Sequence, residues 1–66
     1  MFEILKQTDG IRGSFVRLIR LGPDDLTVLV RSSGDGKIQH RYVGPDSSKA
    51  EEVFNLESQT LLRRID

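Results

Sequence analysis

The chain has 66 residues, with ten Lys and Arg side chains balanced by ten Asp and Glu side chains, so its formal net charge at neutral pH is zero. This length fits one domain, residues 1–66, with a small core. There is no cysteine and only one histidine, His40, which excludes a disulfide and a zinc site with the usual four Cys/His ligands. We therefore expect neither a metal nor a cofactor, and the neutral chain lacks the overall basic field typical of nucleic-acid-binding proteins.

The first residues, MFEILKQTDG, do not combine a basic start with a long apolar run, so they do not look like a secretory signal. No apolar stretch approaches the roughly 20 residues that span a bilayer. We expect a soluble, cytoplasmic protein with no membrane partner.

Turn signals divide the first part of the chain. They are TDG at 8–10, GPDD at 22–25 and SGDG at 33–36. Between and beside them lie short runs rich in aliphatic and β-branched residues: FEILKQ, SFVRLIRL, LTVLVRS and KIQHRYV. Such runs with tight connections predict an antiparallel β-meander of three to four strands.

The pattern changes after Gly44 and Pro45, which end the last strand. Ser48 and Glu51 have the spacing of a capping box. At 100° per residue, one apolar side is formed by Ala50, Val53, Phe54, Leu61 and Ile65. These features predict a C-terminal helix over about residues 48–64, packed on one sheet face in an α+β fold. The alternative is a small SH3- or Sm-like β-barrel, in which EEVFNL and LLRRI would be strands.

The side chains on each sheet face depend on strand register. If Leu21 faces Leu26 across GPDD, the helix covers Phe15, Ile19, Leu21, Leu26, Val28 and Val30. A three-residue GDG loop with Gly36 at positive φ would add Ile38, His40 and Tyr42, whereas a two-residue loop would place Gln39 and Arg41 there. We favour the first loop because it keeps apolar side chains together. This register turns Arg17 toward the core, which requires either a buried stem that reaches the sheet edge or a different register in that strand.

The opposite face would then carry aliphatic side chains and arginines, and the helix would leave it uncovered. Its predicted members are Val16, Leu18, Arg20, Thr27, Leu29, Arg31, Gln39, Arg41 and Val43. A mixture of aliphatic side chains and arginine is typical of interaction surfaces, although an ordinary solvated sheet face has the same composition. The candidate binding residues are Leu18, Arg20, Leu29, Arg31, Gln39 and Arg41.

The residues do not favour catalysis. His40 is the one side chain that titrates near neutral pH without assistance, and a general base also needs a nucleophile and an orienting acid. The SGDGK segment lacks the Ser or Thr of a phosphate-binding P-loop and leads into a strand where a helix is required.

We predict a non-catalytic interaction module that binds another protein or forms a homodimer through this face. The alternative is a nucleic-acid-binding accessory domain, because guanidinium groups also suit phosphates and guanine edges.

Overall fold

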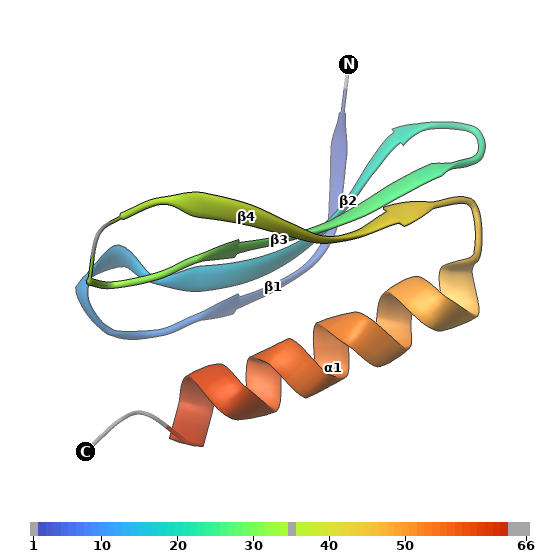
Figure 1. The fold of residues 1–66 in the computed structure, drawn as a ribbon. Helices are drawn as coiled ribbons and strands as arrows, with labels where there is room; N and C mark the ends of the chain where they lie inside the picture. Colours follow the sequence, from blue (N-terminus) through green and yellow to red (C-terminus); the bar gives the residue numbers. More distant parts are fainter. Residues whose placement is uncertain (1, 35, 64–66) are drawn as a thin grey trace.

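The computed structural model describes residues 2–34 and 36–63. Its elements in chain order are β1 (Glu3–Asp9), the short 3₁₀ helix η1 (Ile11–Gly13), β2 (Phe15–Gly22), β3 (Asp25–Arg31), β4 (Ile38–Gly44) and α1 (Ser47–Arg63). The strands form one antiparallel sheet in the order β1-β2-β3-β4, and α1 lies along one side of it (Figure 1). The predicted α+β fold is confirmed. The barrel alternative is wrong, because α1 occupies the residues that its last two strands would need.

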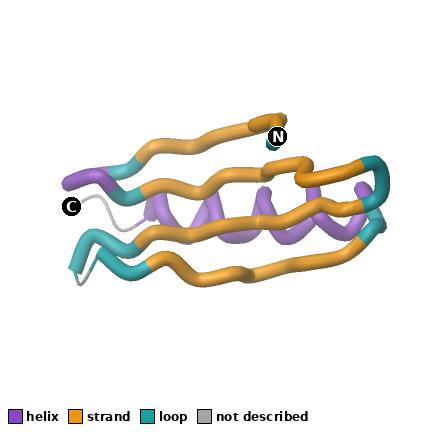
Figure 2. The backbone as a smooth tube through the Cα atoms, turned by 90° about the horizontal axis from the view of Figure 1, so that it is seen from above, coloured by secondary structure: helices purple, strands orange, loops and turns teal. Residues whose placement is uncertain are grey.

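The sheet and the helix make two layers. Figure 2 shows α1 behind the sheet; among the described residues the near side carries no α-helix, and the start of β1 and the β2–β3 hairpin rise on that side (Figure 1). We call this uncovered side the open face. By strand register and alternation its members are Ile4, Gln7, Asp9, Phe15, Arg17, Ile19, Thr27, Leu29, Arg31, Ile38, His40 and Val43.

The main core lies between the sheet and α1. Its buried members are Val16, Leu18, Leu26, Val28, Ala50 and Phe54, and Val30, Tyr42, Val53 and Leu61 pack around them. Residues 50, 54, 58 and 61 recur at helical spacing, so α1 presents one stripe to the sheet. Beside the apolar stripe, the buried Ser58 hydroxyl donates to Thr8 Oγ1 of β1 at 2.9 Å.

The predicted faces of β2 are reversed in the structure. Gly22 pairs with Asp25, so the β2–β3 turn is tighter than predicted, and the register shifts between Arg20 and Gly22. Arg20 therefore lies opposite Leu26, in the place expected for Leu21. A shift of one residue exchanges every side chain between the faces. As a result, Val16 and Leu18 belong to the core, whereas Phe15 and Ile19 lie on the open face.

The β3–β4 hairpin has its irregularity in the strand, not in the loop as predicted. Gly36 has the expected positive φ of 70°. However, Arg31 pairs with Ile38 and Val30 with Gln39, which is the register that an even-numbered loop gives. A bulge then shifts the register between Val28 and Leu29. This bulge returns Tyr42 to the core side while leaving Ile38 and His40 on the open face.

Asp46, not the predicted Ser48, caps α1. The Lys49 backbone N–H donates to Asp46 Oδ1 at 3.2 Å, and the Ala50 N–H donates to the Asp46 carbonyl at 3.0 Å. Tyr42 also fixes this junction, because its hydroxyl accepts a hydrogen bond from the Asp46 N–H at 3.1 Å. The helix start is thus attached to the last strand.

Candidate interaction surface

The structure distributes the predicted binding residues over both sides of the sheet. Leu18 is buried, with 3% of its surface exposed, and packs in the core under α1. Arg20 also lies on the helix side, where its Nη2 is 2.7 Å from Glu3 Oε1 across the β1–β2 pair. Neither side chain belongs to the open face, because the β2 register differs from the predicted one by one residue.

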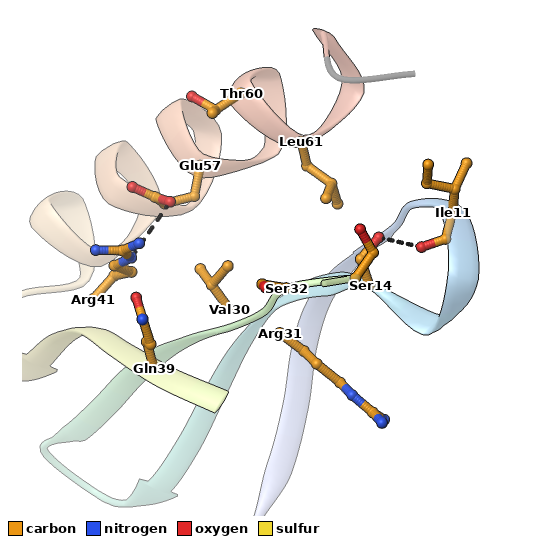
Figure 3. Close-up of a pocket in the computed structure, with 11 residues that line it drawn as sticks. Ile11, Ser14, Val30, Arg31, Ser32, Gln39, Arg41, Glu57, Thr60 and Leu61 are labelled. Carbon is orange, nitrogen blue, oxygen red and sulfur yellow. Dashed lines mark hydrogen bonds and ion pairs between the residues drawn. The ribbon is translucent and has the colours of Figure 1, made fainter. Parts of the chain in front are cut away.

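Gln39 and Arg41 also face the helix. Figure 3 shows both side chains extending from β4 toward α1, and Arg41 Nε lies 3.6 Å from Glu57 Oε1. The loop register is the cause, because it pairs Gln39 with Val30 on the helix side. The bulge then places Tyr42 on the same side as Arg41. Of the predicted binding residues, Leu29 and Arg31 remain on the open face, and Figure 3 shows the Arg31 side chain extending away from α1.

The centre of the open face is well ordered although no described element covers it. Phe15, Ile19 and Thr27 expose only 8%, 5% and 3% of their surfaces. Neighbouring side chains of the twisted sheet provide this burial. Ile19, for example, lies between Ile4 of β1 and Thr27 of β3. The central strands therefore form a buried floor, which consists of Phe15, Ile19 and Thr27.

Arg17 covers part of that floor. Its guanidinium carbon lies 4.0 Å from the centroid of the Phe15 ring, a cation–π contact. Its Nε also donates to Gln7 Oε1 at 3.0 Å. The awkward inward position that sequence reasoning gave to Arg17 was the signal that could have revealed the true β2 register.

The edge strands carry the exposed apolar side chains of the open face. Ile4 on β1 is 44% exposed, and Ile38 and Val43 on β4 are 52% and 63% exposed. Ile4, Ile19, Thr27 and Val43 occupy one cross-strand row, in which the buried Ile19 and Thr27 lie between the two exposed edge residues. Sequence reasoning missed Ile4, whose side depends on the bulge in β1, and placed Ile38 on the wrong side, because the β3–β4 loop gives the register of an even-numbered loop.

A cleft lies on the other side, between the sheet and the C-terminal half of α1. It encloses about 410 Å³ and is lined by Val30, Gln39, Arg41, Glu57 and Leu61, among others (Figure 3). Its polar groups already interact with one another. Glu57 neutralises Arg41, and Thr60 donates to the Leu56 carbonyl. Ser14 likewise donates to the Ile11 carbonyl. The charged pair between sheet and helix is thus already satisfied, and Arg31, which also lines the cleft, extends away from α1 (Figure 3).

His40 lies on the open face beside Leu29 and is exposed. It forms no hydrogen bond or ion pair with any other residue of the described ranges 2–34 and 36–63. The same ranges contain no cluster of three or more His, Cys, Asp or Glu side chains that could hold a metal ion.

The comparisons with protein-family models, curated proteins and solved structures give no match. No helix among the described residues has the length and apolar character needed to cross a membrane. The arguments for function therefore come from the open face itself.

Proposed function

We propose that this chain is a small non-catalytic interaction module whose open face binds a protein surface. The observation that carries the proposal is the row of apolar side chains that ends in exposed Ile4 and Val43 on the two edge strands. Exposed apolar side chains with arginine nearby are a common property of protein interfaces. Arg17 and Arg31 are the arginines on this face.

The geometry favours the face over the strand edges as the site of contact. An unpaired edge strand can recruit another strand, but bulges interrupt regular pairing. Both edge strands carry one, between Ile4 and Lys6 in β1 and near Arg41 in β4. The face carries the exposed apolar side chains Ile4, Ile38 and Val43, which a partner could cover.

Site-specific photo-crosslinking tests the proposal. A photoreactive amino acid at Val43 in the full chain, expressed in cells of the source organism, should give discrete protease-sensitive adducts. The matched control is Leu56, which is similarly exposed at 56% but lies on α1. Equal labelling from both positions, or no adduct from Val43, would contradict the proposal.

A nucleic-acid-binding role is the second candidate, because basic side chains gather at one end of the molecule. They include Arg12, Arg17, Arg31 and Lys37. Titration with duplex DNA and with RNA at two salt concentrations tests this role. If the role is correct, Arg31→Ala should reduce the slope of the logarithm of the binding constant against the logarithm of salt concentration by about one. Arg20→Ala is the control, since Arg20 is paired with Glu3 on the helix side.

A further inference from the structure

The zero net charge of the chain conceals a separation of charge along its length. We call one extremity the hairpin end, where the β1–β2 connection, the β3–β4 hairpin and the last turn of α1 meet (Figure 1). The opposite extremity is the turn end, where the β2–β3 turn lies near the start of α1. The molecule is 37 Å long, so the two ends are several Debye lengths apart at physiological salt.

Cations predominate among the described residues of the hairpin end. They include Arg12, Arg17, Arg31 and Arg63, and the acid among the described residues there is Asp9. In the ion pairs Lys6–Glu51, Arg20–Glu3 and Arg41–Glu57, the opposite charges neutralise each other within the chain. At the turn end, the acids outside these pairs outnumber the cation Lys49. They are Asp24, Asp25, Asp46 and Glu52.

We propose that the open face binds a second copy of this chain, in a two-fold dimer whose strands run antiparallel across the interface. This inference rests on the proposed function and names the partner. Two sheets that pack face to face have two simple symmetric arrangements. A two-fold axis along the strands would stack the basic hairpin ends on each other, which repulsion disfavours. An axis across the strands stacks each hairpin end on a turn end.

The antiparallel arrangement also matches individual residues. With the axis above Val28, β3 lies over β3 of the second copy in the opposite direction. Arg31 and Asp25 are equally distant from Val28 in sequence, so Arg31 lies over Asp25 of the second copy. Both side chains are on the open side, since Asp25 precedes the core residue Leu26. In addition, the β2–β3 hairpin rises away from α1 (Figure 1), and Asp25 is the first residue of β3 in this hairpin.

The size of the face predicts a weak dimer. Four strands about 4.8 Å apart, each with seven residues rising about 3.3 Å, have a footprint of roughly 450 Å² per chain, or roughly 900 Å² for both. The accessible surface lost would be smaller, because Phe15, Ile19 and Thr27 are already buried within the chain. Interfaces below about 1,200 Å² belong to the weak and transient class. A chain without net charge near neutral pH does not oppose such association by overall repulsion. The expected dissociation constant is on the order of 10–100 μM.

Sedimentation equilibrium of the full chain between about 10 μM and 1 mM, after nuclease treatment, tests the inference. We expect a monomer–dimer equilibrium. Val43→Asp should raise the dissociation constant about tenfold or more, because it buries a charge in each half of the interface. Leu56→Asp is the matched control on α1 and should leave the constant unchanged. Ile38→Glu serves as a second open-face variant, and circular dichroism checks that each variant is folded.

The orientation has its own test. Arg31→Glu and Asp25→Arg should each raise the dissociation constant about five- to tenfold, since two-fold symmetry repeats each change. The double variant should return toward the wild-type value. A double variant no tighter than the single variants overturns the antiparallel arrangement.

Other outcomes distinguish the inference from the proposed function. A chain that stays monomeric at 1 mM, or associates only before nuclease treatment, overturns the dimer. Protein adducts from Val43 would then still support the interaction module. Association that Leu56→Asp abolishes and Val43→Asp does not affect contradicts both.

Discussion

Gly10 occupies a position with no room for a side chain. A Cβ atom there would overlap Ser14 Oγ and would lie 2.9 Å from Leu61 Cδ1 of α1. The Ser14 hydroxyl cannot easily move, because it donates to the Ile11 carbonyl at 2.6 Å. This close approach joins the β1–β2 connection to the C-terminal half of the helix.

We therefore expect Gly10→Ala to lower the free energy of unfolding by about 1–3 kcal/mol. Urea denaturation followed by circular dichroism measures the effect. Gly34→Ala is the control, because the nearest atom to its new Cβ would be Ser32 Oγ at an ordinary 4.0 Å. Equal effects of the two substitutions would show that steric overlap at Gly10 is not the cause.

Leu18 and Leu56 are the same residue type in opposite environments. Leu18 is 3% exposed in the core, and Leu56 is 56% exposed on the outer side of α1. Leu18→Ala should cost about 2–5 kcal/mol through lost burial and a cavity, whereas Leu56→Ala should change stability by less than about 0.5 kcal/mol. Urea denaturation measures this difference as a shift in the midpoint, provided that the dependence of the unfolding free energy on urea concentration stays the same. A small loss of stability in Leu18→Ala would argue against the burial of Leu18 beneath the helix.

At the scale of the element, the junction between β4 and α1 depends on a single carboxylate. Asp46 Oδ1 accepts the Lys49 N–H, while Ser48 lies inside the first turn. We expect Asp46→Ala to destabilise the chain by about 1 kcal/mol, the usual cost of a lost cap. Ser48→Ala should be neutral or slightly stabilising, because alanine is the better helix former. Thermal unfolding of the two variants decides which residue is the cap. A larger loss of stability in Ser48→Ala than in Asp46→Ala would support the capping box at Ser48.

The elements were predictable from local chemistry, whereas the sheet faces were not. Gly, Pro and Asp mark the turns, and the apolar spacing of residues 50–61 marks the helix. Which side chains share a face depends on single extra residues at Leu21 and Arg41. Such bulges follow from strand pairing throughout the sheet, not from the local sequence. The sequence therefore predicted that one sheet face is left uncovered by the helix. However, four of the six binding residues proposed for that face lie on the helix side: Leu18, Arg20, Gln39 and Arg41.

At the scale of the whole molecule, the small core limits stability. A domain of this length rarely gains more than about 3–5 kcal/mol from its core. The floor of the open face adds Phe15, Ile19 and Thr27 to what the helix side buries, so both sides of the sheet contribute apolar packing. A partner that covers the exposed Ile4, Ile38 and Val43 would add stabilisation that is large relative to the total.

Association through the open face should therefore raise the thermal stability of the chain with concentration. A partner present at ten times its dissociation constant stabilises the folded state by about 1.4 kcal/mol. For a domain of this size, each kcal/mol shifts Tm by about 4–8 °C. We expect Tm to rise by about 5 °C or more between about 10 μM and 1 mM protein, and Val43→Asp to remove this dependence. Differential scanning calorimetry at the two concentrations makes the measurement. A Tm that does not vary with concentration in the wild-type chain would contradict the coupling, because an isolated monomer unfolds independently of its concentration.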